Sequence, residues 1–409
     1  MQTSENESAD SEAAARSEAR SVAIGLDARR VATTIGPLFV MAAALACAPV
    51  EPMPSELPNT PARMADIVSA LETALPYAQT EAAFADPAAR AELQGALRQL
   101  AHNAAALELH GGDETPGFRF FSRRLADDAA EISKRFHAGS FDEARFLLNQ
   151  VVDDCAGCHV RLPDPREHGA GIPLTARFAN APPRTRVKLL VATRQFDAAL
   201  ASYEALFHAP EVTPSALDFD GAIEDYLVVA LRVRGDFARA DAGLAALAAR
   251  ADAPPYLAQL LSSWRAALAA LARFEHGSTL VEAREVLALA DGVRRYPADR
   301  SALVHDLVAG GLLHRALARG LANPDETAEA SYLLGLAELR NDPSRSLPQA
   351  EAYLESAIRS APGSELAREA YGVLEEQTVL GWMGSAGFDM PRDVADWLAE
   401  LRAIAGVAR

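Results

Sequence analysis

Two cysteines and a histidine lie close together near the middle of the 409-residue chain, in the run Cys155-Ala156-Gly157-Cys158-His159. Two thiols at this spacing supply thioether bonds to the two vinyl groups of a haem, and the adjacent imidazole supplies a ligand to its iron. The run is therefore typical of a c-type haem attachment site. It predicts one covalently bound haem c, anchored by Cys155 and Cys158 and ligated by His159.

A Cys-x-x-Cys pair also occurs in redox-active dithiols and in zinc sites. A thioredoxin-like pair lies at a strand-to-helix junction, and a cysteine-only zinc site needs a second Cys-x-x-Cys. The only other cysteine in the chain is Cys47. The haem interpretation is therefore favoured over these two alternatives, and no cysteine pair is left to form a structural disulfide.

The residues before the motif predict the helix that must carry it. Apolar residues approach the motif at steps of three and four, the spacing of one helix face: Ala144, Leu148, Val151, Cys155, His159 and Leu162. Cys155 and His159 therefore share a face. Ser140 and Glu143 predict a capping box at the start of this helix, and Pro163 ends it.

Three further apolar stripes at helical spacing precede this helix. Their members are Met64, Ile67, Val68, Leu71, Leu75 and Ala78; then Leu93, Leu97, Leu100, Ala104 and Leu107; then Phe118, Phe121, Leu125, Ile132 and Phe136. The connections between the stripes are short, which forces neighbouring helices to be antiparallel. The sequence therefore predicts an all-α domain at residues 58–163, an antiparallel four-helix bundle that carries the haem motif on its last helix.

This arrangement resembles the cytochrome c-prime superfamily, the class II cytochromes c, in helix order, in the position of the motif and in a methionine near the start of the first helix. The resemblance implies that His159 is the proximal iron ligand and Met64 the distal one. Met64 as an ordinary core residue, with five-coordinate iron or another distal residue as ligand, is the alternative. The chain departs from the family after His159, where Val160-Arg161-Leu162-Pro163 follows. Arg161 is a candidate partner of a haem propionate.

The N-terminal residues 1–48 are predicted to be a polar leader followed by an export signal. Arg29 and Arg30 precede an apolar segment that is too short for a confident membrane span. The residues before Cys47 resemble a lipoprotein box, so Cys47 is a candidate lipidation site that would anchor the chain to a membrane. Signal-peptidase cleavage and an uncleaved anchor are the alternatives. Each places the protein in the periplasm or cell envelope, where haem c is attached.

A Pro/Gly-rich linker is predicted at residues 164–183, and alanine- and leucine-rich helices follow it. Phe196, Ala199 and Tyr203 share a spacing with Phe237, Ala240 and Leu244. These helices, at 184–377, resemble tetratricopeptide (TPR) repeats, which implies an α-solenoid of helical hairpins that docks a partner protein. Another type of helical solenoid is the alternative. Residues 378–409 are predicted to form a capping loop and helix.

The chain has 39 basic and 56 acidic residues and a formal net charge of −17. This charge disfavours nucleic acid as a partner and favours a positively charged redox partner protein. The sequence therefore predicts an envelope-anchored electron-transfer cytochrome rather than an enzyme. A haem-based gas or redox sensor, or a scaffold, with five-coordinate iron is the alternative. A peroxidase ranks third, because the sequence offers no clear polar distal base or second haem motif.

Overall fold

The computed structural model describes residues 60–110, 116–161, 178, 181–296, 299–341, 349–384 and 387–408. Within these ranges the regular structure is helical, apart from two short strands, β1 and β2, that pair antiparallel. The prediction of an all-α protein is confirmed. The leader 1–48 with Cys47, and most of the predicted linker 164–183, lie outside the described residues.

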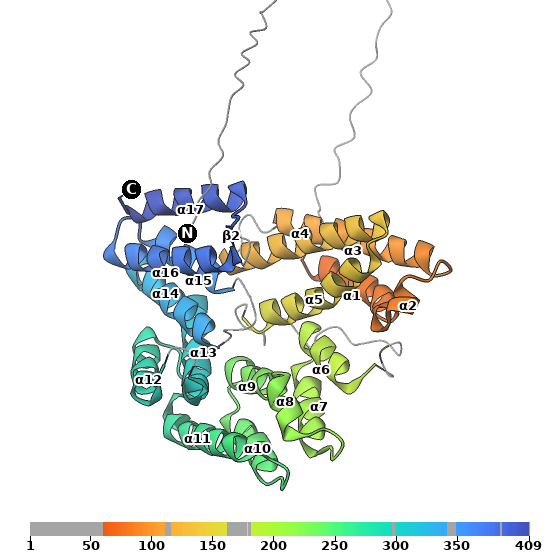
Figure 1. Ribbon diagram of the computed structural model, residues 1–409. Helices are drawn as coiled ribbons and strands as arrows, with labels where there is room; N and C mark the ends of the chain where they lie inside the picture. The colour runs from red at the N-terminus through yellow and green to blue at the C-terminus, as the bar shows by residue number, and fades with distance from the viewer. Residues whose placement is uncertain are drawn as a thin grey trace, which may run out of the picture. The chain divides into compact units, whose positions relative to one another are not determined.

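The elements follow one another along the chain as a series of helices with short connections (Figure 1). In chain order they are α1 (Thr60–Ala74), η1 (Tyr77–Gln79), α2 (Glu81–Phe84), α3 (Arg90–His110), α4 (Pro116–Ala138), α5 (Phe141–His159), α6 (Pro183–Ala192), α7 (Phe196–His208), α8 (Pro214–Phe219), α9 (Ala222–Leu227), η4 (Val228–Arg234), α10 (Phe237–Ala248), α11 (Pro255–Leu271), η5 (Ala272–Phe274), α12 (Leu280–Val293), η6 (Arg300–Ala302), α13 (Leu303–Arg319), α14 (Pro324–Asn341), α15 (Gln349–Ser360), α16 (Glu365–Gly381), β1 (Met383–Gly384), β2 (Gly387–Phe388) and α17 (Arg392–Ala405).

The first hydrophobic core is built by α1, α3, α4 and α5. Helix α3 packs against both α1 and α4, and α4 packs against α5. The apolar stripes seen in the sequence supply this core, whose buried members include Ile67, Leu71, Leu93, Leu97, Leu100, Leu125, Ile132, Leu148 and Val151. Helix α6 packs against α5 and adds Leu189 and Ala192 to the same core.

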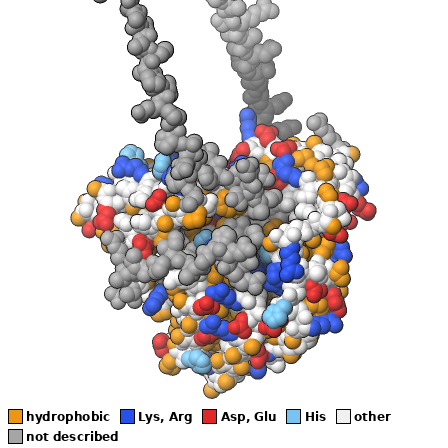
Figure 2. Space-filling view, turned by 180° about the vertical axis from the view of Figure 1, so that it is seen from behind, with side chains coloured by type: hydrophobic (Ala, Val, Ile, Leu, Met, Phe, Trp, Pro, Cys, Tyr) orange, Lys and Arg blue, Asp and Glu red, His pale blue; other side chains and the backbone are white. Residues whose placement is uncertain are grey.

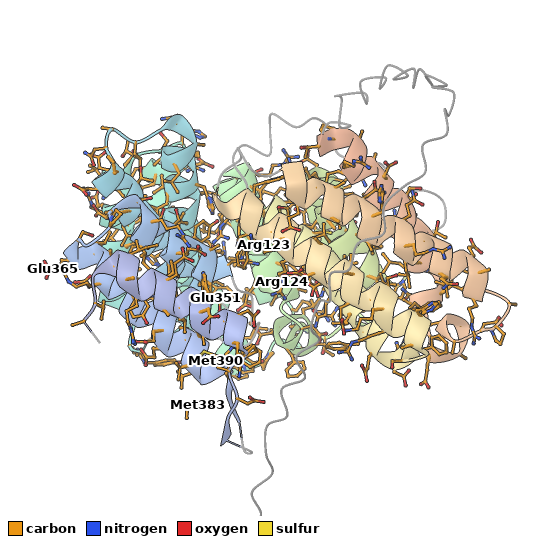
Figure 3. The ribbon with its side chains drawn as sticks, turned by 90° about the horizontal axis from the view of Figure 1, so that it is seen from above. Arg123, Arg124, Glu351, Glu365, Met383 and Met390 are labelled. Atoms are coloured by element: carbon orange, nitrogen blue, oxygen red, sulfur yellow. The ribbon has the colours of Figure 1, made fainter. Side chains whose placement is uncertain are left out.

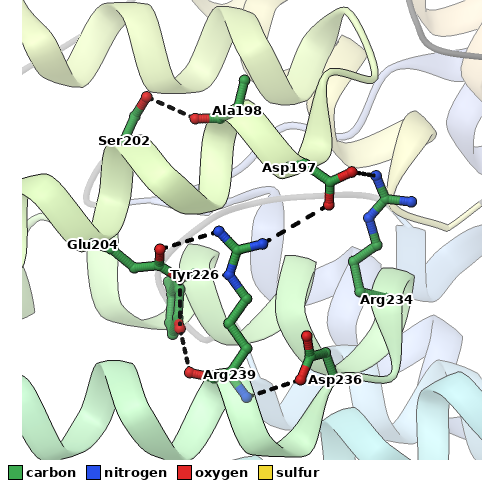
Figure 4. Close-up of polar contacts among 8 residues, drawn as sticks. All are labelled: Asp197, Ala198, Ser202, Glu204, Tyr226, Arg234, Asp236 and Arg239. Atoms are coloured by element: carbon green, nitrogen blue, oxygen red, sulfur yellow. Dashed lines mark hydrogen bonds and ion pairs between the residues drawn. The ribbon is translucent and has the colours of Figure 1, made fainter.

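The second and largest core runs from α6 through α14. The predicted repeat residues are buried in it: Phe196, Ala199, Tyr203, Phe237, Ala240 and Leu244. In Figure 4, Arg239 of α10 donates from Nε to Glu204 of α7 at 2.6 Å. The Tyr226 hydroxyl of α9 donates to the carbonyl oxygen of Arg239 at 2.6 Å. These bonds tie successive helices together across the core.

The same turn occurs before α5, α7 and α10, although the repeat was predicted only at the last two. In each turn a residue with left-handed backbone precedes the helix by two positions: Gly139 (φ 83°), Arg194 (φ 61°) and Gly235 (φ 63°). An aromatic residue then opens the helix and a fully buried alanine follows three positions later, as in Phe141 and Ala144 of α5. Helix α5 thus begins as the helices of the repeat region do.

Helices α15, α16 and α17 share a third core that includes Leu354, Leu374 and Leu401. Helix α15 also packs against α14 and against α4. Figure 3 places Arg124 of α4 beside Glu351 of α15. Burial raises the pKa of Glu351, and the Arg124 guanidinium opposes that rise. Helices from distant parts of the sequence therefore meet beside α4 and α5.

On the face drawn in Figure 2, basic and acidic side chains are interspersed. Among the helices that the structure describes, none combines the length and the apolar character needed to cross a bilayer.

Candidate haem attachment site

Helix α5 carries both cysteines and the histidine on its last two turns. Its apolar face is fully buried at Ala144, Leu148 and Val151, so packing fixes its rotation about its own axis. The predicted capping box is wrong, because the Ser140 side chain makes no capping bond. The other half of the box is absent too, because the Ser140 N–H that Glu143 would bind donates to the carbonyl of Arg135 at 3.0 Å in the left-handed turn at Gly139.

Both cysteines of the motif are free thiols. Cys155 is half-buried and packs against the first core, whereas Cys158 is buried with 8% of its surface exposed. Burial raises the pKa of both thiols, that of Cys158 to about 12, although the guanidinium groups of Arg194 and Arg161 oppose the rise at Cys158. Both thiols are therefore protonated near neutral pH.

His159 is oriented by the last residue of α6. Its Nδ1 lies 2.7 Å from the carbonyl oxygen of Ala192. A carbonyl oxygen only accepts hydrogen bonds, so Nδ1 carries the hydrogen and the lone pair of the neutral ring lies on Nε2. A metal-ligating histidine is held in the same way, by a hydrogen bond from its other ring nitrogen.

Arg161 follows the motif and is bound by α14. Its Nε and Nη2 donate to Glu338 Oε2 at 3.1 and 2.8 Å, and its Nη1 donates to the carbonyl of Gly157 at 3.0 Å. Arg232 of η4 reaches the other oxygen of Glu338, with Nη2 and Oε1 2.9 Å apart. The two guanidinium groups hold the pKa of Glu338 at about 2 against the effect of its own burial. Arg161, Arg232 and Glu338, here called the arginine–glutamate cluster, join α5 to η4 and α14.

Helix α15 lies directly over the motif. A Cβ atom at Gly157 would stand 2.7 Å from Nε2 of Gln349, so the end of the Gln349 side chain reaches the backbone of the motif. Tyr353, one turn further along α15, is electrostatically coupled to Cys158, Arg161 and Glu338, and its burial raises its pKa. The motif is thus enclosed by elements from the C-terminal half of the chain.

Asp154 adds a carboxyl group next to the cysteines. Its Oδ1 accepts a hydrogen bond from Arg124 Nε at 3.1 Å, while its buried Oδ2 has no hydrogen-bond partner. Burial raises the pKa of Asp154 to about 6, against the attraction of Arg124. This residue increases the electrostatic cost of forming a thiolate at either cysteine.

The structure brings together Cys155, Cys158, His159 and Arg161 at the end of α5. Met64 lies half-buried on α1 and packs against the same first core as Cys155. Its role as distal ligand and the propionate role of Arg161 stay predictions. The sequence did not point to the residues that approach the site from elements after α5, among them Ala192, Arg194, Arg232, Glu338, Gln349 and Tyr353. Of these residues, only Arg194 could have been noticed in the sequence. It precedes Phe196 by two positions, just as Gly235 precedes Phe237 in the other copy of the repeat.

The residues at this site fit a covalently bound haem. Two neutral thiols and an imidazole with its lone pair on Nε2 are the groups that thioether attachment and iron ligation require. The buried Nη1 atom of Arg194, beside Cys158, has no hydrogen-bond partner and is suited to an anionic group. Within the described ranges, no three His, Cys, Asp or Glu side chains gather as a metal site. A porphyrin supplies four iron ligands itself, so one or two protein ligands suffice.

Searches of protein-family models, of curated proteins and of solved structures found no match to this chain.

Proposed function

We propose that this chain is a monohaem c-type cytochrome that transfers electrons at the cell envelope. The observation that carries the proposal is His159, whose Nδ1 is bound to Ala192 O within a Cys-x-x-Cys-His run. A hydrogen bond from the second ring nitrogen to a carbonyl is how proteins hold a metal-ligating histidine in one tautomer and one orientation. The haem, when bound, supplies an iron that cycles between two oxidation states.

Cys155 and Cys158 attach the cofactor in the proposed reaction. Each sulfur would bond to one carbon of a haem vinyl group, and the hydrogen of its broken S–H bond would go to the other vinyl carbon. The addition consumes no oxidant or reductant. The raised pKa values of the two thiols keep them protonated before attachment, which slows competing disulfide formation because the thiolate is the reactive form.

The proposal includes the architecture expected from the sequence. Helices α1, α3, α4 and α5 would form a four-helix bundle of the cytochrome c-prime type, supported by their common core. The later helices would form a TPR-like solenoid that docks a positively charged redox partner, supported by the repeated turns before α7 and α10. Lipid at Cys47 would hold the protein at the periplasmic side of a membrane.

The test is to produce the full chain in a host competent for cytochrome maturation and to measure its intact mass and pyridine haemochrome spectrum. We expect the mass of one haem and the spectrum of haem c. Cys155→Ala and Cys158→Ala should each lose a thioether bond, and His159→Ala should lose the native iron ligation. His102→Ala, which changes an exposed histidine on α3, is the matched control and should leave the spectrum unchanged. A wild-type chain with two alkylatable thiols and no added mass would refute the proposal.

A further inference from the structure

Arg194 lies in the turn between α6 and α7, two residues after Ala192, the last residue of α6, whose carbonyl binds His159. Ala192 O accepts the hydrogen bond of His159, and two residues later the Arg194 guanidinium acts on the thiol of Cys158. The end of α6 and the turn after it therefore interact with two residues of the Cys-x-x-Cys-His run, His159 and Cys158.

The backbone of Arg194 is in a conformation that favours glycine. Its φ is 61°, and it is the only non-glycine residue with positive φ among those the structure describes. Its N–H donates to Val191 O at 3.0 Å, and Gln195 N–H donates to Leu190 O at 2.8 Å, which is the hydrogen-bond pattern of a helix-ending turn. The equivalent positions before α5 and α10 are Gly139 and Gly235. A long side chain kept at such a strained position points to a use for that side chain.

The Arg194 side chain is partly buried, and no anionic partner for it is found among the described residues. Its Nη1 is inaccessible to solvent and makes no hydrogen bond. Burial lowers the pKa of Arg194, with Cys158 as the one neighbour that opposes the effect. The neighbouring Arg161 is in a different position, since Glu338 and the Gly157 carbonyl already accept from it. A buried cation without a counter-ion is costly, so the site is suited to a carboxylate that arrives with a ligand.

We propose that Arg194 binds a propionate of the haem attached at Cys155 and Cys158. A guanidinium and a carboxylate form two parallel hydrogen bonds, which fix orientation as well as charge. This inference rests on the proposed function, and it assigns part of the haem site to the turn between α6 and α7, outside the expected bundle. Arg161 then binds Glu338 in the arginine–glutamate cluster, whereas Arg194 binds the haem propionate.

The test compares the full-length wild-type chain with Arg194→Gly and Arg194→Lys, each made in a maturation-competent host. Glycine suits the left-handed turn, so Arg194→Gly removes the guanidinium without straining the backbone. Arg186→Gln removes a charge from an exposed position of α6 and is the matched control. The readouts are intact mass, the propionate bending band in the resonance Raman spectrum, and the reduction potential.

We expect Arg194→Gly to shift the propionate band to lower frequency and to lower the reduction potential, because a nearby positive charge favours the reduced iron. Arg194→Lys should have a reduction potential close to that of the wild type, because the positive charge is kept. Its propionate band should still shift, since an ammonium group cannot form the two parallel hydrogen bonds. Arg186→Gln should change neither. Loss of haem from Arg194→Gly with unchanged circular dichroism would also support the proposal.

Two results would overturn the inference. One is a haem-loaded Arg194→Gly protein with the wild-type band and potential. The other is loss of haem together with the helical signal, which would make Arg194 a structural residue. A wild-type chain without haem would instead refute the proposed function, so the two failures are distinguishable by mass alone.

Discussion

The Nδ1–H of His159 donates to a backbone carbonyl, that of Ala192. A carboxylate partner makes a ligating imidazole more basic and stabilises the oxidised metal, whereas a carbonyl has a weaker effect. The 2.7 Å contact between His159 Nδ1 and Ala192 O therefore favours a higher reduction potential in the proposed site. A methionine as sixth ligand would act in the same direction.

Met64 decides between the two candidate functions. With Met64 as distal ligand, the oxidised protein should show the weak near-infrared band of sulfur bound to ferric iron. Met64→Ala should abolish this band and open the iron to carbon monoxide. Met390→Ala is the control, because Met390 packs against the separate third core. A wild-type protein that lacks the band and binds carbon monoxide readily would favour the gas-sensor alternative.

The individual groups of the site were predictable only where they are local in sequence. Spacing within one helix is enough to place Cys155 and His159 on a common face. The hydrogen bond from His159 to Ala192 spans 33 residues, and a backbone carbonyl leaves no trace in residue type. Glu338 pairs with Arg161 across 177 residues, and nothing in the sequence distinguishes it from other helical glutamates.

The helices were predictable because each one buries a periodic apolar face. Leu93, Leu97 and Leu100 were expected on the inner side of one helix and are fully buried there. The repeated turn at Gly139 was not predicted, because the haem motif dominates the interpretation of α5 and the linker separates α5 from the later helices. Gly139, Phe141 and Ala144 nevertheless carry the same turn and spacing as Gly235, Phe237 and Ala240. The signal was therefore present in the sequence.

Small residues at helix contacts set the distance between the repeated hairpins. A Cβ atom at Gly243 of α10 would lie 2.7 Å from Cζ of Tyr226, whose side chain is fully buried. The ring cannot move away easily, because its hydroxyl donates to the Arg239 carbonyl at 2.6 Å. Glycine at this position therefore permits close packing of α10 on α9.

Gly243→Ala should lower the free energy of unfolding by about 1–3 kcal/mol, the usual cost of overpacking a core. Gly372→Ala in α16 is the matched control, since a Cβ there meets nothing within 4 Å. Its free energy of unfolding should rise by about 0.5–1 kcal/mol, because alanine restricts the unfolded chain and favours the helix. Urea unfolding followed by circular dichroism measures both. Equal stability of the two variants would contradict this account of the α9–α10 contact.

Considered as a whole, the molecule encloses the end of α5 with helices from its C-terminal half. The arginine–glutamate cluster is the polar part of this enclosure, with side-chain exposures of 10% for Arg161, 5% for Glu338 and 2% for Arg232. Two buried cations share one carboxylate, so removing the carboxylate leaves both without their partner. The cluster therefore couples the position of the haem motif to the integrity of α14 and η4.

Glu338→Gln should lower the free energy of unfolding by about 3–5 kcal/mol at pH 7, the typical cost of breaking a buried ion pair by removing one member. Glu329→Gln is the matched control on the same helix. Glu329 pairs with Arg284 at a more exposed site, with side-chain exposures of 31% and 47%, so its loss should cost under about 1 kcal/mol. Denaturant unfolding of the three proteins at pH 7 measures these differences.

The pH dependence separates charge from packing at Glu338. The pKa of Glu338 is lowered in the folded protein from 4.5 to about 2, so its ionised form contributes stability fully above pH 4.5. That contribution is lost as the pH falls from 4.5 toward 2, by about 1.4 kcal/mol for each unit of pKa shift. The difference in free energy of unfolding between wild type and Glu338→Gln should therefore become smaller as the pH falls from 4.5 toward 2. A difference that stays constant down to pH 2.5 would show that glutamine disturbs packing, and that the cluster does not depend on the Glu338 charge.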